Sequence, residues 1–218
     1  MITFKTALEI ASHEALVRQT YKDSVGVLTW SIGITSATGH DVSRYIGKPQ
    51  SLDHCLEIYV WALSNYAEAV RSEFSGSNLT EEQFAAALSF HWNTGAIRSA
   101  TWPDLWKAGR ISEARASFMS WRKPASIIDR RTKEAALFFD GVWSSGGDVV
   151  EYTRLGGNMV PAWSSAKMIS IEEPLRRLLA PDAPAEAVAP AAPKASPVAA
   201  VIAAILKLLE WLTKGRRT

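Results

Sequence analysis

Hydrophobic positions along residues 1–140 recur mostly at the three- and four-residue spacing that is typical of amphipathic helices. The first helix is predicted over residues 7–20, where apolar residues follow this spacing at Leu8, Ala11, Ala15 and Leu16. A second helix is predicted from a cap at Ser51 or Asp53 to about residue 74. Its apolar positions are Leu56, Val60, Leu63, Ala67 and Val70.

The clearest helix signal lies in "SGSNLTEEQFAAALSFHWNTG". Thr80 and Gln83 form a capping-box pattern, and Gly95 stands where a glycine commonly ends a helix. Three further helices are predicted over residues 103–108, 112–121 and 129–139, the last with Asp129 as its cap.

One early segment has a different pattern. Residues 25–34, "VGVLTWSIGI", are rich in valine, isoleucine, tryptophan and threonine, with glycines at 26 and 33, and predict a short β-hairpin or meander. Strands and helices do not alternate along the rest of the chain. We therefore predict an α+β fold that is mostly helical, with a small N-terminal β-hairpin or sheet.

The C-terminal third divides into segments of different composition. Glycines and short extended pieces over residues 141–170 predict a loosely structured extension that packs back on the domain. Residues 176–197 read as an Ala/Pro-rich linker, and residues 198–218 as an apolar and basic helix. The predicted domain is therefore 1–175.

Composition narrows the classes of function. The 218 residues are 47% apolar, with nine tryptophans, which suffices for a folded core. The net charge of +2 is too small to indicate nucleic acid binding. A single cysteine excludes an intramolecular disulfide and a cysteine metal cluster, and the four histidines have no metal-ligand spacing. No metal site and no cofactor are expected.

Two carboxylates and a threonine near the N-terminus suggest chemistry. Cleavage of a glycosidic bond needs one carboxylic acid to protonate the leaving oxygen and a second carboxylate to steer water or stabilise charge. Glu14, in the second half of the predicted helix beside apolar residues, suits the acid. Asp23, after the helix, would stay ionised, and the Thr29 hydroxyl could hold a water against it. Taken singly, each residue is ordinary: Glu14 as a surface charge, Asp23 as a cap or turn residue and Thr29 as a strand residue. The signal is therefore their joint spacing, Glu-x8-Asp-x5-Thr.

This spacing resembles the N-terminal signature of the phage-type lysozymes, the bacteriophage endolysins. The matching residues are Glu14, Asp23, "VGV" at 25–27, Thr29 and Gly33. Two later segments are also similar: "ALSFHWNTGAIRSATW", where Asn93 would line the saccharide cleft, and "IIDRRTKEAALFFDG", a helix that closes the domain. The resemblance implies a lysozyme-like fold with Glu14 as the general acid.

The chain departs from the family pattern at two positions. Ala15 stands where the family often has glycine, and Ile34 where it usually has histidine. His13 precedes the acid and is interpreted as a neighbour rather than a partner. Gly33 and Asn93 are the predicted substrate-binding residues, and among the tryptophans Trp102 is the best candidate for a substrate contact.

The implied activity is hydrolysis of the β-1,4 bond between N-acetylmuramic acid and N-acetylglucosamine in bacterial peptidoglycan by a monomeric enzyme. An inverting outcome is favoured, because Asp23 and Thr29 together suit a held water. Three alternatives stay open: a lytic transglycosylase, a retaining glycosidase with a covalent sugar on Asp23, and a non-catalytic wall-binding or membrane-permeabilising module.

The tail and the N-terminus bear on where the protein acts. Residues 198–218 combine one apolar helical face with Trp211 and the basic "KGRRT", which favours contact with an anionic membrane surface. Docking on the domain, oligomerisation or a membrane span are the alternatives. The N-terminus has no secretory signal pattern. We therefore expect synthesis in the host cytoplasm and release to the cell wall or periplasm by a separate route.

Overall fold

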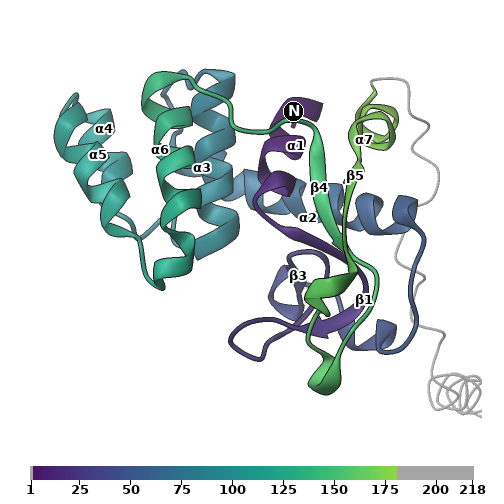
Figure 1. The fold of residues 1–218 in the computed structure, drawn as a ribbon. Coiled ribbons are helices and arrows are strands. Elements are labelled where there is room, and N and C mark those ends of the chain that lie inside the picture. The colour runs from purple at the N-terminus through teal and green to yellow at the C-terminus, as the bar shows by residue number, and fades with distance from the viewer. Residues whose placement is uncertain (1, 181–218) are drawn as a thin grey trace, which may run out of the picture. The chain divides into compact units, whose positions relative to one another are not determined.

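A computed structural model describes residues 2–180 of the chain. Its helices are α1 Phe4–Ser12, α2 Leu52–Glu73, α3 Glu81–Thr94, α4 Trp102–Lys107, α5 Ile111–Ser120, α6 Ile128–Asp140 and α7 Glu172–Leu179. Its strands are β1 Ala15–Lys22, β2 Leu28–Ile32, β3 Ile34–Thr35, β4 Asp148–Tyr152 and β5 Ala166–Ser170. The predicted α+β, mostly helical fold is confirmed (Figure 1).

The five strands form one sheet in the order β3-β2-β1-β4-β5. β1 is the central strand: it runs antiparallel to β2 on one side and parallel to β4 on the other. The predicted hairpin, β2 and β3, is therefore one side of a larger sheet, next to the central β1. The other side, β4 and β5, comes from the segment that we expected to be loosely structured.

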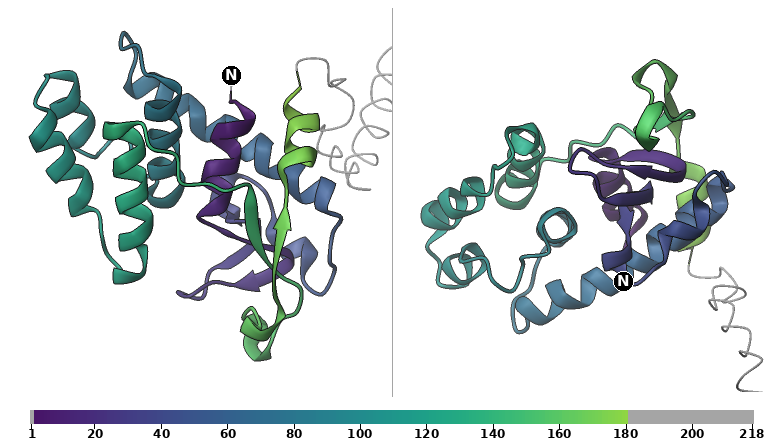
Figure 2. Two further views of the ribbon diagram at one scale, coloured as in Figure 1. Left: turned by 45° about the horizontal axis from the view of Figure 1, so that its top comes forward. Right: turned by 90° about the horizontal axis from the view of Figure 1, so that it is seen from below.

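The long helix α2 connects the sheet to the helical part of the molecule, which consists of α3 to α6 (Figure 2). It contacts both α3 and β2. The Ser51 side chain accepts a hydrogen bond from the backbone N–H of His54 and caps the helix, so Ser51 rather than Asp53 is the cap. The predicted capping box of Thr80 and Gln83 is confirmed at the start of α3.

The core of the helical part is aromatic. Trp102 is fully buried, and its ring contacts four phenylalanines that come from α3, α5, α6 and the end of α2. These are Phe74, Phe90, Phe118 and Phe138. The tight apolar packing gives α3 and α6 a fixed position relative to each other, and the polar groups of the candidate site lie on these two helices.

The helix predicted over residues 7–20 is wrong in its second half. α1 ends at Ser12, and residues 15–22 form β1. Leu16 and Val17 point to opposite faces of the sheet and are both buried, so both faces of the central strand β1 are covered at this point. Apolar residues at helical spacing were thus part of a buried strand, a pattern that periodicity alone does not separate from a helix.

Two smaller predictions also need correction. Asp129 does not cap α6, which begins at Ile128; it lies in the first turn and pairs with Lys133 at 2.7 Å. α7 runs to Leu179 and crosses the predicted boundary between residues 175 and 176. The remainder of the predicted linker and the predicted helix over 198–218 lie outside the described residues.

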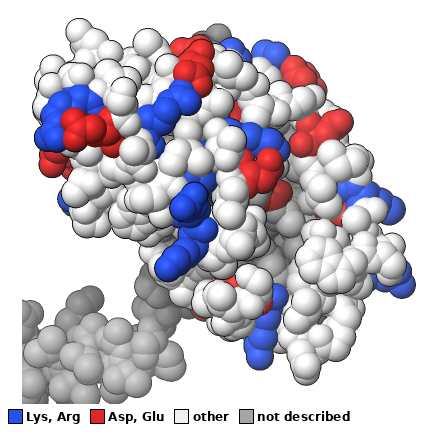
Figure 3. Space-filling model, turned by 60° about the vertical axis from the view of Figure 1, so that its left-hand side comes forward, with Lys and Arg blue, Asp and Glu red and all other residues white. Residues whose placement is uncertain are grey.

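The described surface carries charges of both signs. Figure 3 shows the molecule from the side of the helical part. Basic and acidic side chains lie near one another there, and wide uncharged areas lie between these groups. Within residues 2–180, no helix has the length and apolar character needed to cross a membrane.

Candidate active site

Glu14 lies at the junction of α1 and β1. Its backbone N–H donates to the carbonyl of Ala11 in the last turn of α1, at 3.1 Å, and the next residue begins β1. The side chain is 21% exposed and its Oε1 atom accepts a hydrogen bond from Arg130 of α6, at 2.5 Å. A half-turn between helix and strand therefore directs the carboxyl to the helical part of the molecule.

Arg130 belongs to a buried network of charges between α3 and α6. Glu134 is 1% exposed and accepts hydrogen bonds from Arg130 Nε at 2.8 Å, from the Ser89 hydroxyl at 2.6 Å and from Arg131. Arg131 is fully buried and lies with its guanidinium over the ring of Phe90. Because each buried charge has charged or polar partners, the network gives Arg130 a fixed position beside Glu14.

The two arginines respond differently to this burial. For Arg130, burial by itself would lower the pKa, but the charges of Glu14 and Glu134 outweigh it and the pKa lies above its usual value. For Arg131, burial lowers the pKa more than Glu134 raises it. Glu14 and Glu134 both contact Arg130, and their negative charges stabilise its positive charge. Glu14 therefore faces a guanidinium that stays protonated.

Gly33 lies against the Glu14 carboxyl. A Cβ atom at this position would lie 3.2 Å from Glu14 Oε2 and 3.0 Å from the indole nitrogen of Trp92. Gly33 also has a φ of +70°, in the region that favours glycine. The family resemblance led us to expect Gly33 in substrate binding; the structure shows that it leaves room for the acid between β2 and α3.

Asp23 occupies the turn between β1 and β2. Its Oδ1 atom accepts hydrogen bonds from the backbone N–H groups of Val25 and Val27, at 3.0 and 2.8 Å. Among the described residues, these bonds engage Oδ1 only. Backbone donors thus hold the Asp23 side chain within the turn.

Thr29 is connected to Asp23 through the backbone of a single residue, Val27. The Thr29 hydroxyl donates to the carbonyl of Val27 at 3.2 Å, and the N–H of Val27 donates to Asp23. The side chain is 3% exposed. The hydroxyl therefore has a backbone partner in this structure, and its oxygen lone pairs stay available to accept from a water.

Tyr21, which the sequence patterns do not single out, lies near both carboxylates. It pairs with Thr29 across β1 and β2 and is 8% exposed. Burial raises its pKa, and the charges of Glu14 and Asp23 raise it further. The charges of Glu14 and Asp23 thus both act on the Tyr21 hydroxyl.

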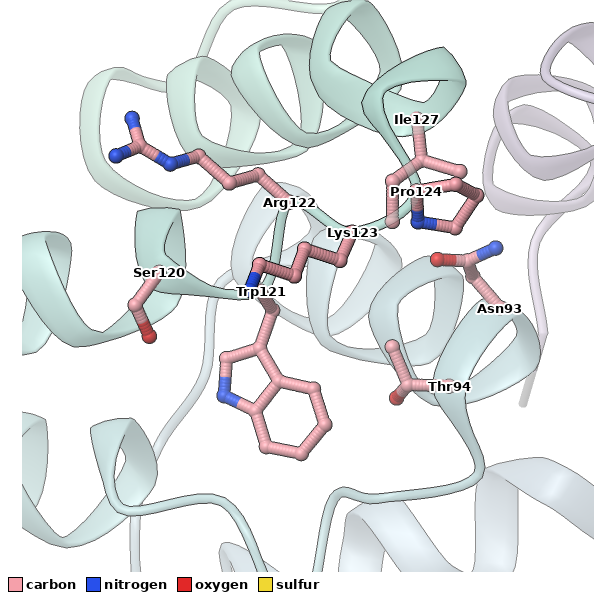
Figure 4. A pocket seen from close by; sticks show the side chains of 8 residues that line it. All are labelled: Asn93, Thr94, Ser120, Trp121, Arg122, Lys123, Pro124 and Ile127. Atoms are coloured by element: carbon pink, nitrogen blue, oxygen red, sulfur yellow. The ribbon is translucent and has the colours of Figure 1, made fainter.

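A pocket of about 450 Å³ opens beside the end of α3 (Figure 4). Its lining combines one aromatic ring, two cationic side chains, an amide and hydroxyl groups: Asn93, Thr94, Ser120, Trp121, Arg122, Lys123, Pro124 and Ile127. The Asn93 Oδ1 atom accepts from Arg131 at 2.6 Å. Because a guanidinium only donates hydrogen bonds, this contact assigns the amide oxygen, and the Asn93 amide N–H groups remain for a ligand.

Trp102 does not reach this pocket. The prediction that it contacts a substrate is wrong, because its ring is fully buried in the aromatic core of the helical part. Trp121 instead packs on Phe90 and also lines the pocket. Its backbone carbonyl also accepts from Arg131 Nε at 2.9 Å, so the Asn93 and Trp121 positions are fixed by the same guanidinium.

Sequence reasoning noted "IIDRRTKEAALFFDG" as a closing helix but missed that its charges reach the site. The signal was present: Arg130, Arg131 and Glu134 share the helix face of the apolar Ala135 and Phe138. Charged residues on the apolar face of a helix are rarely buried without partners. Such a pattern indicates an internal ionic network.

The described residues show no cluster of three or more His, Cys, Asp or Glu side chains placed to hold a metal ion. Cys55 is buried, and burial raises the pKa of its thiol to about 12.

Comparison with known proteins places the chain in a family. The phage lysozyme family model matches residues 11–134, which is more than half of the chain and includes Glu14, Asp23, Thr29, Asn93 and Glu134. No curated protein sequence matches.

Solved structures share the fold at low sequence identity. An endolysin from Escherichia coli O157:H7 phage FAHEc1 is 22% identical, with a TM-score of 0.59 over 66% of this chain and 97% of its own. The active form of P1 phage endolysin Lyz is 18% identical, with a TM-score of 0.54 over 65% and 86%. The muramidase domain of SpmX from Asticaccaulis excentricus is 23% identical, with a TM-score of 0.53 over 63% and 97%.

Proposed function

The chain belongs to the phage lysozyme family and is a peptidoglycan hydrolase, and we propose that it cleaves the β-1,4 bond between N-acetylmuramic acid and N-acetylglucosamine. The observation that carries this proposal is the placement of Glu14. One oxygen of its carboxyl is fixed by Arg130, while the other lies beside Gly33 and the Trp92 indole. The side chain is partly buried but still reachable, as a group that transfers a proton to a polymer must be.

In this proposal Glu14 protonates the leaving oxygen. The Arg130 guanidinium holds one carboxyl oxygen of Glu14 in place, so that the other oxygen can point to the bond to be cleaved. After proton transfer, Arg130 stabilises the carboxylate that remains.

Asp23 and Thr29 act on the other side of the bond. The Asp23 Oδ2 atom would accept a hydrogen bond from the attacking water, while Oδ1 stays on the backbone of the turn. Thr29 accepts from the same water through its hydroxyl oxygen. Water attack opposite the leaving group corresponds to inversion at the anomeric carbon.

The pocket beside α3 is the proposed continuation of the substrate site. The Asn93 amide N–H groups would donate to a carbonyl or hydroxyl oxygen of the substrate, and the Trp121 ring supplies an apolar wall for a sugar face. Arg131 links this pocket to the Glu14 site through Glu134 and Arg130. Substrate position and acid position are therefore set by one network.

The test is loss of turbidity of purified peptidoglycan with wild type and Glu14→Gln. We expect the rate to fall by roughly 10²–10⁴-fold in a variant with unchanged circular dichroism. The new sugar ends are then analysed: reducing ends indicate hydrolysis, and anhydro-muramic ends indicate a transglycosylase. Undiminished lysis by Glu14→Gln would contradict the proposal and favour a non-catalytic module.

Asp23→Asn and Thr29→Ala separate the remaining rivals. Hydrolysis by a held water requires both residues, so each variant loses activity. A transglycosylase needs the acid but not this pair and would keep its rate. A covalent sugar trapped on Asp23 would instead identify a retaining glycosidase.

A further inference from the structure

Residues 141–180, here called the extension, fasten directly to α1 through a buried carboxylate. Glu9 is fully buried on α1 and accepts hydrogen bonds from the backbone N–H groups of Ser144 and Ser145, at 3.0 and 2.8 Å, and from the Ser144 hydroxyl at 2.6 Å. Burial by itself would raise the pKa of Glu9, but His13 and these bonds outweigh it and lower the pKa. The Glu9 carboxylate is thus ionised and hydrogen-bonded to Ser144 and Ser145 of the extension.

The helix that carries Glu9 also positions Glu14. α1 ends at Ser12, and the N–H groups of His13 and Glu14 still donate to Ile10 and Ala11 of its last turn. The Ala7 carbonyl accepts from the buried Tyr59 hydroxyl of α2 at 2.8 Å. Because the chain turns from helix to strand within two residues, a shift of α1 would move the Glu14 backbone with it.

The extension also holds the other side of Glu14. Ala15 and Leu16 pair in parallel with Val150 and Glu151 of β4, and Leu16 pairs with Ile32 of β2 on the opposite edge. Further along β1, Arg18 forms an ion pair with Glu151 at 2.7 Å. The helix that precedes Glu14, α1, is therefore bonded to Ser144 and Ser145, and the strand that follows it, β1, is bonded to Val150 and Glu151 of β4.

We propose that the extension is a brace for the catalytic acid, in which Glu9 is a positioning residue that holds Glu14 in register with Arg130 through Ser144 and Ser145. The family match ends at residue 134, before the brace begins. The inference rests on the proposed function, since it assigns Glu14 the role of the acid.

A brace has a kinetic signature that general destabilisation lacks. A proton must pass between atoms within hydrogen-bond distance, so a small displacement of the acid lowers the rate of the chemical step. Substrate binding relies on the pocket beside α3, which the extension does not line. Loosening the brace should therefore lower kcat and leave KM in place.

The experiment compares Glu9→Gln with wild type on soluble peptidoglycan fragments. We expect kcat to fall at least tenfold with KM unchanged within twofold. Amide hydrogen exchange of residues 13–17 should accelerate, while exchange in α3 and α6 stays the same. Glu82→Gln is the matched control: Glu82 accepts a hydrogen bond from the neighbouring Trp143 at 3.1 Å, and among the described residues its carboxyl makes no hydrogen bond with α1, whose Lys5 lies over the Trp143 ring. Its kcat should equal that of wild type.

Ser144→Ala and Ser144→Thr provide a milder pair if Glu9→Gln does not fold. The alanine variant loses the hydroxyl bond to Glu9 and should lower kcat, and the threonine variant, which keeps a hydroxyl, should restore it. Wild-type kcat in a folded Glu9→Gln, or an equal loss in Glu82→Gln, would overturn the brace. If wild type itself does not cleave peptidoglycan, the proposed function fails, and unchanged exchange at 13–17 in the variants would then separately overturn the brace.

Discussion

Glu14 and Asp23 are held by opposite means. Glu14 is a half-buried acid in contact with a buried ionic network of Arg130, Glu134 and Arg131. Asp23 is a turn residue whose partners are the backbone N–H groups of two exposed valines. The first arrangement depends on side chains from distant parts of the chain, whereas the second is local to five residues. Substitution should therefore disturb the two acids very differently.

The largest effect is expected for Glu134→Gln. It leaves Arg131 buried without its counter-charge, and removal of one partner from a buried ion pair costs about 3–5 kcal/mol of unfolding free energy. Urea unfolding measures the change. Glu113→Gln removes the partner of the exposed Arg110 and is the control, for which we expect the same midpoint as wild type. Equal midpoints for both variants would show that the network does not stabilise the fold.

Gly33→Ala should have the next largest effect. Its φ of +70° costs about 1–2 kcal/mol for alanine, and contact of the new methyl group with Glu14 and Trp92 costs about 1–3 kcal/mol more. Gly109→Ala isolates the first term, since Gly109 has a φ of +74° and nothing within 4 Å. We expect both variants to lose stability in thermal unfolding but only Gly33→Ala to lose lytic activity. A fully active Gly33→Ala would contradict the close approach to the acid.

Asp23→Asn should change stability by less than about 0.5 kcal/mol, because the asparagine Oδ1 atom can accept the same two backbone bonds. Activity should nevertheless fall by roughly 10²–10⁴-fold, since the charge is lost. Paired turbidity and urea-unfolding measurements test this separation. A large loss of stability would show that the turn depends on the charge and not only on the hydrogen bonds.

The smallest effect at neutral pH is expected for Tyr21→Phe. The folded-state pKa of Tyr21 is raised, so above about pH 10 the unfolded chain loses the proton while the folded chain keeps it. The unfolded state then binds fewer protons, and wild-type stability falls as pH rises. Tyr21→Phe should show a shallower fall between pH 9.5 and roughly 11 in pH-dependent urea unfolding. An identical slope in both proteins would argue against a raised pKa for Tyr21 in the folded state.

The same contrast explains which features could be predicted from sequence. The Thr80–Gln83 capping box, the Ser51 cap and the hairpin are local, and the patterns indicated them correctly. The strand over residues 15–22 was missed because its second neighbour, β4, lies far away in the sequence. The partner of Glu14 on α6 was missed for the same reason, since 116 residues separate Glu14 and Arg130. Trp102 was misjudged because the burial of a ring depends on tertiary packing.

The parallel pairing of β1 with β4 has a consequence for the order of events during synthesis. Ala15 of β1 pairs with Val150 of β4, so β1 can form this pairing only after a further 150 − 15 = 135 residues have been synthesised. At translation rates of roughly 5–20 residues per second, this interval is on the order of ten seconds. Helices α2 to α6 emerge first and can assemble on local contacts. The segment that bears the acid is completed only when almost all of the described chain has left the ribosome.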